Sequence, residues 1–94
     1  MKLIIAIIQD EYVNKVIRTL MDNKIRTTRL SSTGGFLKAG NTTLLIGAEV
    51  DELDHIVKLI GGETQTKKIR DGQEEVTVGG ANLFVIDIND YIKL

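Results

Sequence analysis

Hydrophobic positions in the first quarter of the chain follow two different patterns, first a continuous run and then a helical spacing. Lys2 to Ile8 is an apolar, β-branched run of strand length. Asp10 follows and can cap a helix, and Asn23 suits the left-handed position that ends one. Between these two residues, apolar side chains recur at the i, i+3, i+4, i+7 spacing of one buried helical stripe, namely at Val13, Val16, Ile17 and Leu20. The pattern predicts a strand followed by a helix.

The same alternation returns in the middle of the chain. Runs rich in β-branched residues predict strands over 25–32 and 42–48. Asp51 is expected to open a second helix, and Gly61 with Gly62 is expected to end it. The stripe predicted to be buried in that helix is Leu53, Ile56, Val57 and Ile60.

The stretch before the last strand is less regular. Residues 63–70 are polar and fit either an edge strand or part of a loop, and a turn is indicated at Asp71-Gly72. Strands are predicted over 75–78 and 83–88, joined through Gly79-Gly80 as a tight hairpin.

The order of predicted elements indicates the fold class and the domain organisation. It is β-α-β-β-α-β with an extra strand or hairpin inserted before the last strand, which is the α+β, ferredoxin-like pattern. The 94 residues fit a single domain spanning 1–94 and leave no room for a second. A domain this short has a thin core, which a partner surface would help to complete.

The predicted strands are apolar on both faces. Because successive side chains of a strand point to opposite faces, a sheet covered by helices on one side should alternate apolar with polar residues. In the first strand one face carries Leu3, Ile5 and Ile7, and the other carries Ile4, Ala6 and Ile8. The run from Leu83 to Ile86 repeats this pattern. The second face needs a cover, so we predict a homo-oligomer.

Composition excludes several functions and places the protein in a cellular compartment. The net charge of -1 argues against a general nucleic-acid-binding protein, which would carry a basic excess. The absence of cysteine excludes a disulfide scaffold and thiol chemistry. The apolar N-terminal run is too short to span a bilayer, and no export signal follows it. We therefore expect a cytoplasmic protein that is not associated with membranes.

A glycine-rich loop, residues 32–43, is the most informative segment for function. Consecutive glycines let backbone N–H groups converge on an anion, and Arg26, Arg29 and Lys38 lie within or just before the loop. The apolar pair Phe36-Leu37 beside these cations suits a base stacked near its phosphate. The same residues are also compatible with ordinary turns and with a pair of side chains tucked into the core.

The other candidate motifs give weaker evidence for a function. Residues 35–42 have the glycine spacing of a P-loop, but Asn41 stands where the lysine should be and a strand follows instead of a helix, so we reject an NTPase. His55 is the single histidine and has no companion metal ligands in sequence, so we expect no metal site. No arrangement suits a catalytic residue, and we predict that the protein is not an enzyme.

The chain resembles the PII-like cyclic-di-AMP receptor proteins of Gram-positive bacteria. The resemblance rests on MKLIIAIIQD at the start, NKIRTTRLSSTGGFLKAGNTTLLIG in the middle and EVTVGGANLFVI near the end. It implies a trimer of ferredoxin-like subunits without catalysis or a cofactor. One cyclic-di-AMP molecule would lie in each cleft between subunits and reshape loops that then engage a downstream protein. Carried over to this sequence, the ligand contacts are Arg26, Thr28, Gly35, Phe36, Leu37, Asn41, Gly47 and Phe84.

An alternative function stays open at this point. A PII-like adaptor could bind another adenine nucleotide, such as ATP or ADP, or only a protein partner. The short, charged stretch at residues 63–75 and Lys93 near the C-terminus motivate this alternative.

Overall fold

The computed structural model describes residues 1–30, 40–64, 67–71, 74–78 and 80–94, with side chains described outside 65–79. Its centre is a four-stranded sheet in the order β2-β3-β1-β6, in which every neighbouring pair is antiparallel. The strands are β1 (Lys2–Gln9), β2 (Thr27–Leu30), β3 (Asn41–Ala48) and β6 (Ala81–Asp87). Because β3 lies between β1 and β2, the first strand–helix–strand unit is split, as the ferredoxin-like pattern requires.

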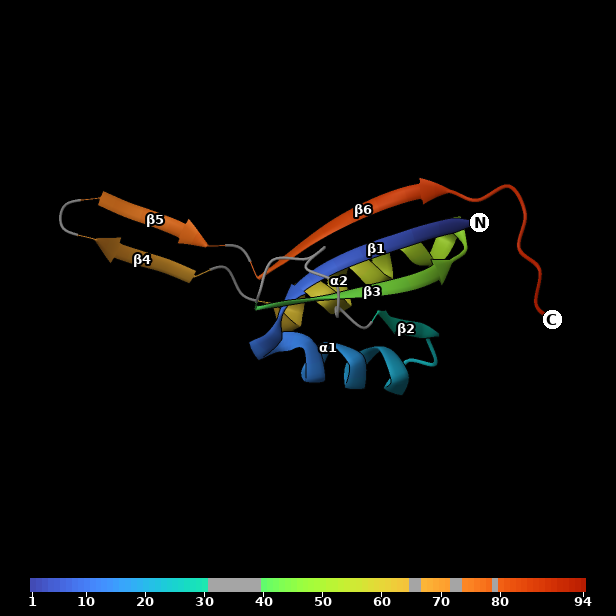
Figure 1. The fold of residues 1–94 in the computed structure, drawn as a ribbon, viewed down its shortest axis with the longest axis horizontal. Helices are drawn as coiled ribbons and strands as arrows, with labels where there is room; N and C mark the ends of the chain where they lie inside the picture. Colours follow the sequence, from blue (N-terminus) through green and yellow to red (C-terminus); the bar gives the residue numbers. More distant parts are fainter. Residues whose placement is uncertain (31–39, 65–66, 72–73, 79) are drawn as a thin grey trace.

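Two helices cover one face of this sheet in the part of the chain that the structure describes. They are α1 (Asp10–Asp22) and α2 (Leu53–Glu63), and the short 3₁₀ helix η1 (Val50–Glu52) leads into α2. In Figure 1 the strands pass in front of α2, so the view looks onto the face without helices. The core between the layers consists of Ile4, Ala6, Ile8, Val13, Val16, Leu20, Ile25, Leu44, Ile46, Ala48, Ile56 and Ile60. The predicted α+β architecture is confirmed.

Helix α1 follows its predicted stripe but begins and ends differently. Asp10, expected as the cap, is its first residue, and Gln9 holds the N-cap position. Its buried side chains are Val13, Val16 and Leu20, and Ile17, the fourth residue of the predicted stripe, is partly buried against the core. Asn23 does not take the left-handed position: its φ is -95°, and its side-chain amide donates a 2.8 Å hydrogen bond to the Thr19 carbonyl. Lys24 has the positive φ of 60° instead. The asparagine caps through its amide, so the reversal falls one residue later.

Helix α2 departs from the prediction at both ends and in its buried stripe. Asp51, which was expected to open it, lies in η1, and α2 begins at Leu53. It continues through Gly61 and Gly62 to Glu63, since glycine can adopt helical angles when the neighbouring turns hold it. The helix ends where the Thr64 hydroxyl turns back and donates a 2.7 Å hydrogen bond to the Ile60 carbonyl. Val57, predicted to be buried, is 40% exposed.

The buried stripe of α2 is rotated because tertiary packing selects the face. Ile56 and Ile60 are fully buried, and Leu53 and Leu59 pack against the core from either side. On one side of the two isoleucines, Leu59 thus takes the contact that the sequence spacing had assigned to Val57.

The inserted segment forms an arm outside the main sheet. Strands β4 (Lys67–Asp71) and β5 (Glu74–Val78) pair with each other as a separate two-stranded sheet, which extends away from the body in Figure 1. Gly72, the second residue of the predicted turn, lies outside the described residues. The predicted tight hairpin between β5 and the last strand is wrong, because β5 pairs with β4 while β6 pairs with β1.

Two consecutive backbone amides at the β1–α1 junction hold the ends of both long connections. The Gln9 N–H donates to the Gly80 carbonyl at 3.1 Å, and the Asp10 N–H donates to the Gly40 carbonyl at 2.9 Å. The Thr42 hydroxyl adds a 2.7 Å hydrogen bond to the Asp10 carboxylate. The glycine-rich loop and the arm therefore end at neighbouring points of the fold.

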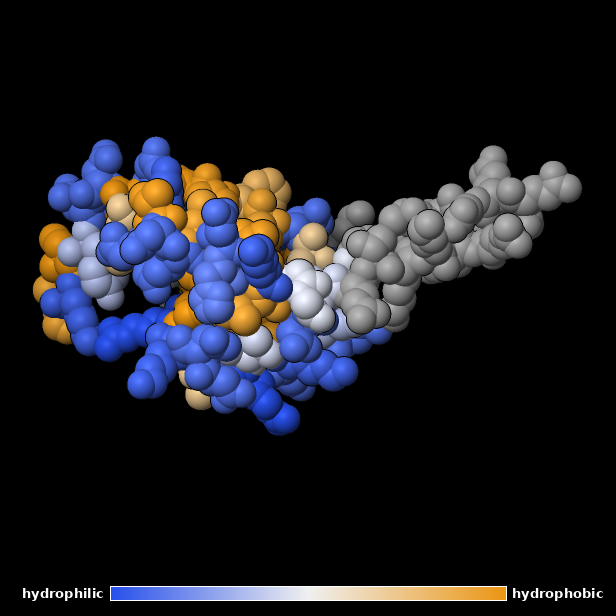
Figure 2. All heavy atoms as spheres, turned by 180° about the vertical axis from the view of Figure 1, so that it is seen from behind, coloured by the Kyte–Doolittle hydropathy of each residue, from blue (hydrophilic) through white to orange (hydrophobic). Residues whose placement is uncertain are grey.

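The surface seen from the reverse direction is mixed in character. Figure 2 shows hydrophilic side chains spread over the body between patches of hydrophobic ones. None of the helices among the described residues is long and apolar enough to cross a membrane.

Candidate functional site

The sheet face opposite α1 and α2, which no helix of the described residues covers, is largely apolar, as the strand patterns predicted. Leu3, Ile5 and Ile7 of β1 are half-buried on this face, whereas the alternate residues Ile4, Ala6 and Ile8 are fully buried under the helices. The register places Ile5 between Leu45 of β3 and Phe84 of β6, and Phe84 is 55% exposed. We call this surface the open face.

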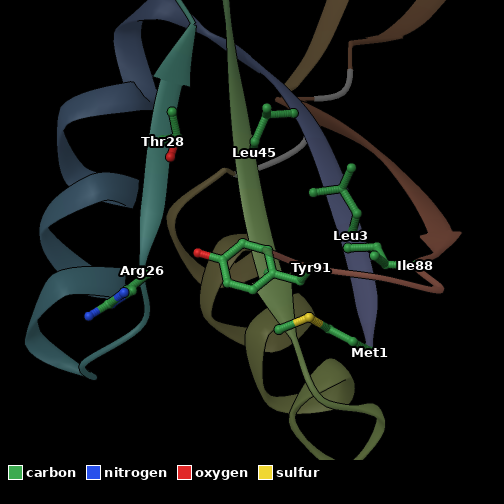
Figure 3. Close-up of a pocket in the computed structure, with 8 residues that line it drawn as sticks. Met1, Leu3, Arg26, Thr28, Leu45, Ile88 and Tyr91 are labelled. Atoms are coloured by element: carbon green, nitrogen blue, oxygen red, sulfur yellow. The ribbon is translucent and has the colours of Figure 1, made fainter. Parts of the chain in front are cut away.

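One end of the open face is hollowed into a pocket of about 460 Å³. This volume lies within the range of about 300–1,000 Å³ typical of small-molecule sites. The pocket lies where β1 begins, β3 ends and the chain leaves β6, and Figure 3 shows its side chains. Its lining residues are Met1, Leu3, Arg26, Thr28, Leu45, Gly47, Ile88 and Tyr91.

Antiparallel pairing explains the floor of the pocket. Leu3 lies opposite Gly47, and Thr28 lies opposite Leu45, so all four are open-face positions of their strands. Gly47 adds no side chain there. A Cβ at this position would meet only the flexible end of Met1, at 3.8 Å. The glycine therefore leaves room above the strand that a larger residue would fill.

Two polar side chains provide the wall on the β2 side. Arg26 lies just before β2 and is exposed, and Thr28 is exposed within the strand. Neither makes a side-chain hydrogen bond or ion pair with the residues that the structure describes. A guanidinium and a hydroxyl beside an apolar floor can bind a phosphate and the polar edge of a ligand.

The chain termini form the opposite wall. The Ile88 N–H donates a 3.0 Å hydrogen bond to the Met1 carbonyl, which extends the β1–β6 pairing by one residue. The Lys2 ammonium pairs with the Asp87 carboxylate next to it. This hydrogen-bonded cation holds the pKa of Asp87 below its ordinary value. The start of the C-terminal segment is thus fixed at the edge of the pocket.

The structure brings three of the eight residues expected to contact ligand into this pocket: Arg26, Thr28 and Gly47. Asn41 pairs with Gln9 at the other end of β3, six residues from Gly47, or about 20 Å along the strand. Phe84 lies on the open face of β6, separated by strands β1 and β3 from Thr28 on β2, and does not line the pocket. Gly35, Phe36 and Leu37 lie outside the described residues.

The remaining lining residues were not predicted as ligand contacts. Leu3 and Leu45 were detectable as strand positions on the second apolar face. Met1, Ile88 and Tyr91 had no local signal, because only the pairing of the two ends of the chain brings them together.

The other sequence candidates do not form a second site among the described residues. His55 lies exposed on α2. No three histidine or carboxylate side chains in the described part of the chain gather closely enough to hold a metal ion.

Comparison with known proteins gives two findings. Residues 1–73 match the family model described as cyclic-di-AMP receptor. A crystal structure of a functionally unknown protein from Pediococcus pentosaceus ATCC 25745 is similar, with a TM-score of 0.75 and 35% sequence identity over 99% of this chain and 96% of that chain. The family match covers far more than half of the sequence, and the chain belongs to the cyclic-di-AMP receptor family.

Proposed function

We propose that this protein is a cytoplasmic signal transduction protein that binds cyclic-di-AMP and transmits occupancy to a partner protein without catalysis. The pocket on the open face forms part of the ligand site. Arg26 neutralises a phosphate, Thr28 hydrogen-bonds the ligand, and Gly47 lets the ligand approach the strand. Gly35, Phe36, Leu37, Asn41 and Phe84 complete the contacts.

The observation that carries this proposal is the convergence of Arg26, Thr28 and Gly47. They come from two strands and the segment before them, yet they line one pocket with an apolar floor. A cyclic dinucleotide has two phosphates and two bases, so it needs both a cationic and an apolar surface. The family match gives the ligand its name.

The remaining contacts fit a site that is shared between subunits. Asn41 and Phe84 lie away from the pocket in a single chain, at other positions of the same sheet. We propose a homotrimer in which the open faces pack together and a neighbouring subunit brings its Phe84 to the ligand. Exposed Phe84 and Ile86 and half-buried Ile5 supply the apolar surface that such packing requires.

Ligand titration tests the binding function directly. In calorimetry, cyclic-di-AMP should bind saturably near one molecule per subunit, whereas cyclic-di-GMP should not bind. Arg26→Ala should raise Kd by about 10-fold or more, since a hydrogen bond to a charged group contributes about 1.5–3 kcal/mol. A parent protein that binds no cyclic-di-AMP, or an Arg26→Ala variant that binds as tightly as the parent, would contradict the proposed site.

Gly47→Val provides a variant that separates binding from folding. Added carbon atoms at this position project toward the pocket and meet little else in the described structure. The variant should keep its thermal unfolding midpoint while losing cyclic-di-AMP binding. Equal affinity in the variant and the parent would show that the ligand does not occupy the space above this strand.

ATP and ADP test the alternative function. The family match ends at residue 73. It therefore includes Met1 and Leu3 of the pocket but not Ile88 and Tyr91. Binding of ATP or ADP without binding of cyclic-di-AMP would favour the adaptor function.

The oligomer has an independent test by light scattering after size-exclusion chromatography. Phe84→Glu places a charge on the open face and should dissociate the trimer. Val57→Glu is the control, because Val57 is a comparably exposed apolar residue on the helical side. A Phe84→Glu protein that keeps the parent mass would exclude the open face as the interface.

A further inference from the structure

The C-terminal segment, residues 88–94, supplies an aromatic side chain to the pocket. Tyr91 lines the pocket together with Arg26 and Gly47, although it lies beyond the last strand. Figure 3 shows its ring projecting across β3 toward the side where Arg26 and Thr28 lie. The family model ends before this segment.

The position of Tyr91 follows from backbone pairing. The hydrogen bond from Ile88 to Met1 and the ion pair between Lys2 and Asp87 hold the chain at the start of β1. Tyr91 comes three residues after Ile88, a span of at most about 10 Å in an extended chain. The ring therefore stays within reach of the pocket.

The ring of Tyr91 is available for contact. Its side chain is 66% exposed, and it has no hydrogen bond with any residue that the structure describes. An exposed aromatic ring that is held beside an apolar floor offers a flat surface. Purine bases bind such surfaces by stacking, while a nearby cation binds the phosphate.

We infer that Tyr91 is a ligand-contacting residue of this pocket, and that its ring stacks on one adenine of the bound nucleotide. The inference rests on the proposed function, since it adds a contact to the same site. Arg26 and Tyr91 then divide the recognition: the guanidinium binds phosphate on the β2 side, and the phenol ring covers the base on the side of the C-terminal segment. The 460 Å³ hollow is the space left between them.

Affinity measurements separate the ring from its hydroxyl. Tyr91→Leu should raise the Kd for cyclic-di-AMP by about 5- to 150-fold, the range that stacking one base on an aromatic ring produces. Tyr91→Phe keeps the ring and should bind within about 3-fold of the parent, less than the about 5-fold that a 1 kcal/mol loss would give. Ile92→Ala is the matched control, because Ile92 is the next residue, 79% exposed, and does not line the pocket.

Intrinsic fluorescence gives a direct readout of stacking. The chain has two tyrosines and no tryptophan. Tyr12, the other tyrosine, packs beside Gly80, near the end of the sheet away from the pocket. Cyclic-di-AMP should quench the parent's fluorescence through Tyr91, and it should leave the fluorescence of the Tyr91→Phe variant unchanged.

The outcomes distinguish this inference from the proposed function. Failure of the parent protein to bind cyclic-di-AMP overturns both. Binding by the parent, with equal affinity in Tyr91→Leu and no quenching, overturns the role of Tyr91 alone. Tighter binding by Tyr91→Leu also overturns it, because the ring would then obstruct the ligand. Weaker binding by Tyr91→Leu, together with parental binding by Ile92→Ala and quenching, supports the inference.

Discussion

Replacement of Gly80 by alanine tests how tightly the base of the arm is packed. A Cβ at this buried position would lie 3.0 Å from the backbone carbonyl carbon of Thr64, 3.0 Å from its Cβ and 3.0 Å from the Tyr12 ring. Carbon atoms pack best at about 3.5–4.0 Å, so all three neighbours would have to move. One of them is backbone, which gives way less easily than the end of a flexible side chain.

The expected cost follows from these contacts. Overpacking by one methyl group in a tight site costs about 1–3 kcal/mol of unfolding free energy. Displacement of Gly80 also strains the hydrogen bond that its carbonyl accepts from the Gln9 N–H, and such a bond contributes about 1 kcal/mol. Gly80→Ala should therefore destabilise the protein by about 1–3 kcal/mol.

Chemical denaturation at equal protein concentration measures this loss of unfolding free energy. Two control substitutions are expected to raise the unfolding free energy instead. Gly61 and Gly62 lie in α2 with open space around their added Cβ positions. Alanine at either site should stabilise the helix by up to about 1 kcal/mol. A Gly80→Ala protein as stable as the parent, beside stabilised controls, would refute the packing argument.

Three further measurements test other parts of the fold. Thr42→Val removes the partly buried hydrogen bond to the Asp10 carboxylate and should cost about 1–2 kcal/mol in denaturation. Leu20→Ala empties a fully buried position of the core and should cost about 2–5 kcal/mol in the same assay. The pKa of Asp87, lowered by Lys2, should rise toward its ordinary value in Lys2→Met when carboxyl shifts are followed by NMR. Because the folded-state pKa is depressed, the stabilisation by this pair is present above the unfolded-state pKa of Asp87. It should be lost as pH falls through the folded-state pKa, and a pair without this pH dependence would contradict the assignment.

The elements of the fold that local spacing determines could be predicted from the sequence. The stripe of α1 holds at Val13, Val16 and Leu20, because α1 contacts both the sheet and α2. The stripe of α2 was rotated away from Val57, since helical spacing gives the period of a buried face but neighbouring layers choose its direction. Gly61 and Gly62 carry a local stop signal, yet the helix passes through both and ends at Glu63.

The arm shows the limit of local turn signals. Gly79-Gly80 has the composition of a tight hairpin, but the partner of the last strand is β1, with Ala81 opposite Ile8. That pairing joins distant parts of the chain, so its stability depends on contacts that no short window contains. Strands β4 and β5 flank the predicted turn at Asp71-Gly72, and their pairing joins neighbouring parts of the chain.

The candidate site also has a part that could be predicted from the sequence and a part that could not. The strand alternation indicated an uncovered apolar face, and the resemblance supplied Arg26, Thr28 and Gly47, which the structure places in one pocket. The wall made by Ile88 and Tyr91 depends on a hydrogen bond between the two ends of the chain. Neither composition nor spacing carries information about that contact.

The close approach of Thr64 and Gly80 has a consequence for how the arm can vary. These residues flank the whole segment 65–79, and they touch, so the segment leaves the body and returns to it at one point. Among the residues that the structure describes, the packed contact between segment and body is at this closing point, and doubling the length of a flexible loop costs only about 0.6 kcal/mol. The arm is therefore a replaceable module: a shorter turn or a longer hairpin can be grafted there while the rest of the domain keeps its architecture.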